Sequence, residues 1–475
     1  MERAGWAKTP WLRIALVAFV AMVWLNQSVG GKDWESLRDE VFAAPLSHPL
    51  LAARYPFVFL YRRSLDERYY FETAGAILGE PADAEVFRQM HGKMPAGFEK
   101  PLPPADSRWH APYTEVPLEY PPLNLPFFIA PRCIVSTFAG YGYLFGGVMG
   151  LCLVLAVFLG VDVARQAGAS LEERREKWLL AAGLLLAQGA LSIQRLDPIA
   201  ALFLALALHA AARRRPFTLG VAAGLAGAAK ILPFLVLPAL VVADRSLVRD
   251  RRSLLRVALG AALALAVGFG PLLLSRVALS SMMSFHLARG LNVESTLGVL
   301  FGVLRALAGH REAAPASFGS QNFDGGWPDA LAKLTLPLML LALLWLAFRV
   351  HRRPPAAEGA RVERLGLAAL ASVAVLWLTS KVLSPQYLTW CIPLVLAIPG
   401  AVGRRLTWIA ILAMIVTQLY FRGFYDLVVE QAPVALVVLV VRQALLFVLL
   451  GISLRALLGR DARVKAAGSV EAARP

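Results

Sequence analysis

The chain has 475 residues, of which 58% are hydrophobic and only 17% are charged. An ordinary soluble domain, in which about a quarter of the residues are charged, is therefore excluded. The net charge of +16 would suit a nucleic-acid-binding protein, but the basic residues form short clusters between apolar segments and not one patch. That distribution is typical of the cytoplasmic loops of a membrane protein, and it argues against nucleic acid as a partner.

A helix needs about 20 apolar residues to cross a bilayer, and basic clusters mark the side on which each loop lies. The first apolar run, residues 10–27, lacks a small-residue cleavage site, so we expect a transmembrane helix here and not a signal peptide. The apolar run 123–131 is too short to cross, and we expect it at the membrane interface. Further spans are predicted at 141–165, 178–194, 198–212, 254–275, 334–350, 365–379, 388–402, 406–421 and 434–457.

The segment 217–243 has basic clusters on both flanks. One crossing would place one of the clusters outside, against the usual distribution of positive charge. We therefore predict two short helices broken near Lys230 and Pro233, with Lys230 at the outer tip. Counting both limbs gives about twelve crossings in a single all-α, polytopic domain with both termini cytoplasmic.

This topology leaves two long segments outside, residues 28–122 and 276–333, and a cytoplasmic tail at 458–475. Channels and transporters usually join their helices by short loops, because their binding sites lie within the bundle. A long, acid-bearing first loop indicates instead an enzyme whose substrate meets the protein at the membrane surface.

Polar residues from five separate segments are all predicted to lie on the outer side. These are Asp66 and Glu67; Glu119 and Tyr120; Lys230; His286, Arg289 and Glu294; and Lys381, Gln386 and Tyr387. Convergence of five segments on one face is a stronger indication of a site than any one of them.

For Asp66 and Glu67, one interpretation is a solvated helix start, where acids are favoured. The other is that Asp66 is a general base for a substrate hydroxyl, with Glu67 and Glu119 as the next candidates. Tyr120 could anchor the chain at the interface or contact substrate.

The three outer cations each have two interpretations. Lys230 could extend its charge to the membrane surface or bind a phosphate, and Arg289 and Lys381 are either ordinary external charges or phosphate ligands. His286 is either a solvated histidine or a substrate contact. The sequence contains no zinc-ligand pattern and no nucleotide-binding loop, so neither a metal nor another cofactor is expected.

Several motifs, in this order along the chain, resemble the GT-C superfamily of membrane glycosyltransferases. The greatest similarity is to glycosyltransferase family 87, the polyprenyl-phosphate-mannose-dependent mannosyltransferases of bacteria. The motifs are LDERYYFETAGAILG around Asp66, EYPPL from Glu119, RLDPIAALFLALAL from Arg195, GLAGAAKILP ending at Pro233, HLARGLNVES from His286 and SKVLSPQYLTW from Ser380.

The resemblance covers about residues 10–455. It implies a GT-C-like bundle in the bacterial inner membrane and transfer of a hexose, mannose first, from a polyprenyl-phosphate sugar. The acceptor would be a hydroxyl of a lipid-linked or glycan molecule on the extracytoplasmic face, with Asp66 as the base and no nucleotide involved. This chain has a longer first loop than the simplest members of the family, so the acceptor is left open.

Two other functions stay open. A lipid-linked glycan flippase or another transporter would have a cavity at the membrane midplane and internal repeats, and no repeats are evident. An O-antigen ligase or polymerase would generally carry its large loop late in the chain, and not after the first span.

Overall fold

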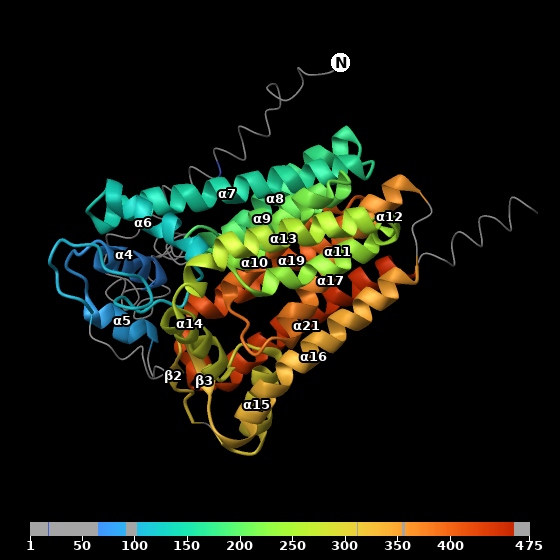
Figure 1. Ribbon diagram of the computed structural model, residues 1–475. Helices are drawn as coiled ribbons and strands as arrows, with labels where there is room; N and C mark the ends of the chain where they lie inside the picture. Colours follow the sequence, from blue (N-terminus) through green and yellow to red (C-terminus); the bar gives the residue numbers. More distant parts are fainter. Residues whose placement is uncertain (1–17, 19–64, 92–101, 311, 354–356, 460–475) are drawn as a thin grey trace, which may run out of the picture.

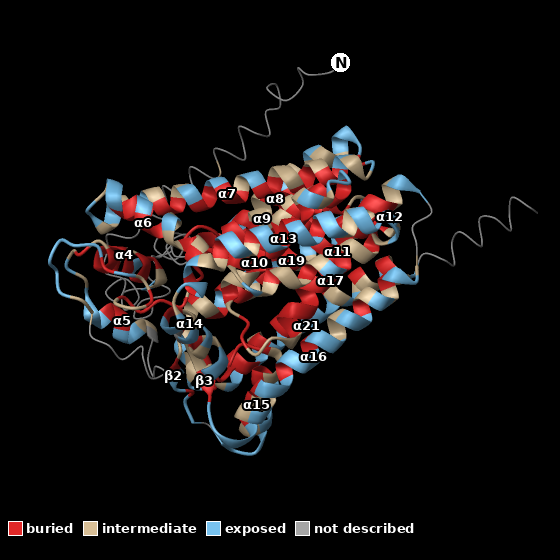
Figure 2. Cartoon of the chain, viewed as in Figure 1, coloured by how far each residue is buried: buried red, intermediate tan, exposed pale blue. Residues whose placement is uncertain are grey.

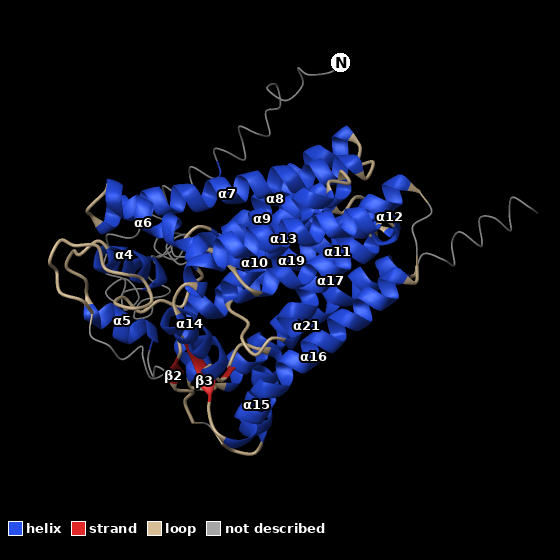
Figure 3. Cartoon of the chain, in the orientation of Figure 1, coloured by secondary structure: helices blue, strands red, loops and turns tan. Residues whose placement is uncertain are grey.

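The computed structural model describes residues 18, 65–91, 102–310, 312–353 and 357–459. The predicted first span apart from residue 18, residues 28–64 and 92–101 of the segment predicted to be external, and residues 460–475 of the tail lie outside the described residues. The rest of the chain is largely helical (Figure 3).

The segment 28–122, predicted to be external, contains α4 (Leu65–Ile77) and α5 (Ala84–His91). The short helices η2 (Pro122–Asn124) and α6 (Leu125–Ile134) follow it. The bundle helices that follow are α7 (Phe138–Gln166), α8 (Leu171–Gln188), η3 (Gly189–Ser192), α9 (Asp197–Ala212), α10 (Pro216–Ala229), η4 (Leu232–Val236), α11 (Leu237–Ala243), α12 (Arg245–Arg249) and α13 (Arg251–Leu273). The second half contains α14 (Arg276–Ala288), α15 (Thr296–Leu307), α16 (Gly326–His351), α17 (Glu358–Thr379), η5 (Pro385–Trp390), α18 (Cys391–Ala397), α19 (Gly400–Gly423), α20 (Tyr425–Val429) and α21 (Pro433–Leu458).

Six of the described helices are long and apolar enough to cross a membrane: α7, α13, α16, α17, α19 and α21. In the apolar 18-residue stretch of each helix, 94% of α17 is buried inside the protein, but only 22% of α16 is. Helix α17 therefore forms the centre of the bundle and α16 its surface (Figure 2). An apolar helix left uncovered by protein is stable only in lipid. The chain is therefore an all-α membrane protein, although these helices support six crossings and not the full expected number of about twelve.

The segment 217–243 is a hairpin, as predicted from its basic flanks. Arg361 of α17 donates hydrogen bonds to the carbonyl oxygens of Ala211 and Ala212, just before the hairpin, and its guanidinium lies 2.7 Å from Asp244, just after it. Both ends of the hairpin therefore lie at one end of the bundle. Lys230 lies at the other end, about 21 Å away at 1.5 Å for each of the 14 residues of α10.

Close packing of α10 against α13 explains the glycine-rich sequence of the hairpin. A Cβ atom added to Gly220 would overlap the carbonyl oxygen of Val257, and one added to Gly260 would overlap that of Phe217. Small residues let two membrane helices approach backbone to backbone, where van der Waals contact holds them together. This packing fixes the height of Lys230 in the bundle.

Two predicted spans need correction. The span at 388–402 is wrong, because the segment forms the short helices η5 and α18. Helix α18 ends at Ala397, since Ile398, the residue before Pro399, has an extended backbone, and α19 begins at Gly400. The helix that contains the predicted span 178–194 begins earlier, at Leu171, because Ser170 caps α8 and accepts a hydrogen bond from the amide of Glu173. It ends at Gln188, since Gly189 has a φ of 55°.

The segment 276–333, predicted to be external, is more ordered than a loop. It contains α14, α15 and a small antiparallel sheet of β1 (Leu291–Asn292), β2 (Ala316–Ser317) and β3 (Ser320–Phe323), with β3 in the centre. Leu291 pairs with Phe323, and Ala316 pairs with Gln321. In Figure 1 this sheet, α14 and the α4–α5 pair gather at one end of the molecule, and α12 lies at the other.

Candidate functional site

Asp66, the candidate base, is held by an arginine. Its side chain is 13% exposed and forms an ion pair with Arg195, which is 8% exposed and lies in the turn between η3 and α9. Asp66 is in the first turn of α4, where the positive end of the helix dipole favours an acid. Asp66 therefore does lie at a helix start, as one interpretation of the sequence expected. It is also paired with an arginine from a distant segment, which that interpretation did not include.

Next to this pair, Lys230 is enclosed by an acid and two aromatic rings. Its ammonium lies 2.8 and 2.9 Å from the two carboxylate oxygens of Asp197 and 4.4 Å from the centre of the Tyr387 ring. Trp390 stacks on Tyr387 and donates an indole hydrogen bond of 2.8 Å to Asp197. Because Asp197 already balances its charge, Lys230 is a weaker phosphate ligand than its position alone suggested.

Buried tyrosines connect α4 to the Glu119–Tyr120 motif. The hydroxyl of Tyr69 donates to the Glu119 carboxylate at 2.7 Å, and the hydroxyls of Tyr70 and Tyr120 lie 3.1 Å apart. His286 from α14 hydrogen-bonds through Nε2 to the backbone oxygen of Glu119 at 3.1 Å. These contacts place the Glu119–Tyr120 motif between α4 and α14.

The electrostatics of Tyr120 show how closely these groups gather. Burial raises the pKa of the Tyr120 hydroxyl well above its usual value, and the charges of Glu119 and Asp197 raise it further. The positive charge of Arg289 acts in the opposite direction. Two acids and one cation, from three separate segments of the chain, therefore act on one phenol.

His286 is neutral at physiological pH. Burial is the main reason that its pKa falls to about 4, and the positive charges of Arg289 and Lys381 lower it further. Its neutral ring can orient Glu119, but it adds no positive charge to the site.

Arg289 and Lys381 form a pair of like charges. The Lys381 ammonium donates to the carbonyl oxygens of Leu287 and Arg289 at 3.0 and 2.7 Å, and the Arg289 guanidinium donates to Ser320 Oγ and the Gly319 carbonyl oxygen. Among the described residues, neither cation forms an ion pair with a carboxylate, and both side chains retain donors for a ligand. Two adjacent cations of this kind favour an anion between them.

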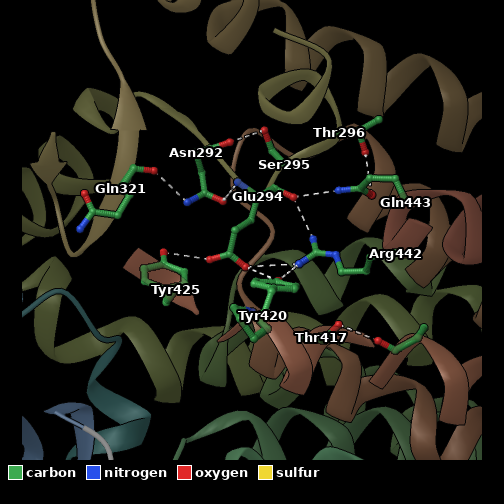
Figure 4. Close-up of polar contacts among 12 residues, drawn as sticks. Asn292, Glu294, Ser295, Thr296, Gln321, Thr417, Tyr420, Tyr425, Arg442 and Gln443 are labelled. Carbon is green, nitrogen blue, oxygen red and sulfur yellow. Dashed lines mark hydrogen bonds and ion pairs between the residues drawn. The ribbon is translucent and has the colours of Figure 1, made fainter. Parts of the chain in front are cut away.

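Glu294 lies in a buried network, which Figure 4 shows. Its carboxylate is 2.5 Å from the Tyr420 hydroxyl, 3.1 Å from that of Tyr425 and 3.2 Å from Arg442. The guanidinium of Arg442 and the amide of Gln443 each donate 2.8 Å bonds to the Glu294 carbonyl oxygen. Burial raises the pKa of the Glu294 carboxyl, and Arg442 opposes the shift. The network fastens the segment after β1 to α19, α20 and α21.

The two remaining candidates differ in burial. Glu67 is fully buried on α4, beside Asp66, and Gln386 is half-buried on η5, next to Tyr387. The described residues contain no group of three histidine, cysteine or acidic side chains arranged to hold a metal ion.

Two residues central to the cluster were absent from the sequence prediction. Arg195 and Asp197 belong to the RLDPIAALFLALAL motif, between the predicted spans 178–194 and 198–212, but neither is among the polar residues predicted to form the outer site. The available signal was that charged residues at the end of apolar spans are functional candidates by default. Comparison of the chain with models of protein families, with curated proteins and with solved structures gave no match.

Proposed function

We propose that this protein is a membrane glycosyltransferase. It would move a hexose, mannose first, from a polyprenyl-phosphate sugar to a hydroxyl of a lipid-linked or glycan acceptor on the extracytoplasmic face. The observation that carries the proposal is the gathering at one end of the bundle of the Asp66–Arg195 pair and the Arg289–Lys381 pair. A carboxylate and an unneutralised cation pair are what such a transfer requires.

In the proposed reaction the acceptor oxygen attacks the anomeric carbon of the donor sugar. The bond from that carbon to the phosphate oxygen breaks, and the new glycosidic bond forms. Asp66 takes the acceptor proton, a role that contributes about 10²–10⁴ in rate. The polyprenyl phosphate leaves with the bonding electrons, and Arg289 and Lys381 stabilise the negative charge that develops on it. Arg195 holds the Asp66 carboxylate in position.

We rank Arg289 and Lys381 ahead of Lys230 as phosphate ligands. Arg289→Ala or Lys381→Ala should weaken binding of free polyprenyl phosphate about 10- to 100-fold, because a charge-assisted hydrogen bond is worth roughly 1.5–3 kcal/mol. Lys230→Met/Asp197→Asn, the matched control, should retain affinity, because it removes both charges of one ion pair. Binding measured in detergent by fluorescence tests the ranking, and a loss only in this control would reverse it.

The affinity for polyprenyl phosphate should also depend on pH. Burial, with a smaller contribution from Arg289, lowers the pKa of Lys381 to about 8. Lys381 is therefore charged below pH 8 and neutral above it, so affinity should fall as the pH rises from 7 to 9. Lys381→Arg stays charged throughout, and should bind with little change over the same range. Equal pH dependence in the two proteins would remove Lys381 from the phosphate site.

A panel of donors and acceptors tests the function itself. Purified protein in detergent is incubated with each pair of a polyprenyl-phosphate sugar and a lipid-linked or glycan acceptor, and products are read by mass spectrometry. We expect one donor class to lose its sugar to an acceptor. A lipid-linked glycan transporter would bind such lipids and leave all of them intact.

A further inference from the structure

The end of the bundle opposite Lys230 carries a dense group of arginines. They lie on α12 and the first two turns of α13, and we call them the α12–α13 basic surface: Arg245, Arg249, Arg251, Arg252 and Arg256. All but Arg245 are exposed. Arg361 balances Asp244, the acid before α12, so Asp250 is the one exposed carboxylate within this stretch.

In the described part of the chain these arginines lack direct ionic partners, and an acid whose charge acts on one of them is Asp250, which interacts electrostatically with Arg256. None of the five forms an ion pair with a carboxylate among the described residues. Arg213 and Arg214, which are exposed at the same end, do form such pairs, with Asp162 and Glu358 at 3.2 and 2.7 Å. The two groups thus differ in whether the protein itself neutralises them.

The helix dipole makes the arrangement unfavourable for the isolated protein. Arg251 and Arg252 are the first two residues of α13, where the partial positive charge of the helix disfavours a cation. Asp250 offsets part of this, since its carboxylate accepts hydrogen bonds from the amides of Arg252 and Ser253. An anion bound from outside the protein would offset the unfavourable interaction that remains between these arginines and the helix dipole.

An apolar stripe on α13 continues directly from this surface. Leu255, Leu259, Leu263 and Val267 follow Arg251 at four-residue intervals and are 52–69% exposed. Residues four apart lie on the same helix face. One phospholipid molecule has both parts that fit this arrangement. Its charged headgroup would lie at the height of Arg251, and an acyl chain would lie along the leucines.

We propose that the α12–α13 basic surface binds the headgroups of anionic phospholipids, whose acyl chains lie along the exposed stripe of α13. The inference stands independently of the glycosyltransferase proposal. A soluble anion would use the arginines alone, whereas a lipid uses both the arginines and the stripe. Each arginine near an anionic membrane surface contributes about a five-fold gain in affinity.

The test measures lipid binding by the purified, delipidated full chain. Native mass spectrometry follows titration with phosphatidylglycerol, with phosphatidylcholine of the same acyl chains, and with inorganic phosphate. The test variant is Arg251→Gln/Arg252→Gln. The control, Arg213→Gln/Arg214→Gln, removes two arginines from the same end that already have acidic partners.

We expect the wild-type protein and the control to prefer phosphatidylglycerol, and the test variant to bind it roughly 25-fold more weakly. The test variant should fold, because it removes cations from a helix N-terminus. If it does not, Arg256→Gln, one turn further along, should give about a five-fold loss. The proposal is overturned if the test variant binds like the wild type, if phosphatidylcholine binds equally well, or if inorganic phosphate displaces the lipid.

Discussion

Asp66→Asn should lower the rate of sugar transfer by about 10²–10⁴-fold, because asparagine keeps the size of the side chain and removes its basicity. It should also lower the stability of the protein, since Arg195 would remain 8% exposed without its partner. Binding of polyprenyl phosphate should change little, because the Arg289–Lys381 pair is untouched. Rate, affinity and unfolding midpoint should be measured on the same preparation.

Two controls separate catalysis from stability in this experiment. Asp66→Asn/Arg195→Gln removes both charges, so stability should return while transfer does not. Glu72→Gln removes another nearly buried carboxylate of α4, one that is paired with Arg68 outside the proposed site, and should keep transfer. Recovery of transfer in the double variant would make Asp66 a structural residue.

Arg442→Met should destabilise the protein by about 3–5 kcal/mol, because it leaves the buried carboxylate of Glu294 without its counter-charge. Glu294 is 3% exposed and Arg442 is 1% exposed, so water cannot replace the lost partner. The unfolding midpoint in denaturant, measured by tryptophan fluorescence, gives the size of the effect.

The companion variant decides the role of Glu294. Glu294→Gln should also destabilise, and the double variant Glu294→Gln/Arg442→Met should lose less than the sum of the two single losses, because both charges have gone. If Glu294 instead contacts substrate, Glu294→Gln will leave stability unchanged and lower transfer alone. Gln443→Leu removes one neutral hydrogen bond to the same carbonyl oxygen and should cost only about 1 kcal/mol.

The positions of long helices could be predicted from the sequence, because a helix that crosses lipid needs a long run of apolar residues, and such a run is easy to recognise. The expected span 141–165 is α7, and the basic flanks of 217–243 were sufficient to predict its return at Lys230. Prediction failed at 388–402, where hydrophobicity continues but the extended backbone of Ile398, the residue before Pro399, ends the helix. It also overlooked the short sheet, whose pairing depends on contact between β1 and β3.

The polar partners could not be predicted, because they come from segments far apart in the chain. The sequence marked Asp66, but its pairing with Arg195 depends on how α4 docks beside α9. It treated Lys230 and Lys381 alike, whereas the structure neutralises the first with Asp197 and leaves the second beside Arg289. In each case the residue type identified a candidate, but whether an opposite charge neutralises it could be known only from the folded structure.

The most direct test of the proposed function is release of free polyprenyl phosphate from a radiolabelled polyprenyl-phosphate mannose by the purified protein, with no nucleotide sugar present. We expect the wild type to release the lipid phosphate and to transfer the label to an acceptor, and Asp66→Asn/Arg195→Gln to do neither while still binding the lipid. If the wild type leaves this donor and every other polyprenyl-phosphate sugar intact with all acceptors, or if the double variant turns over as fast as the wild type, the proposed function is wrong.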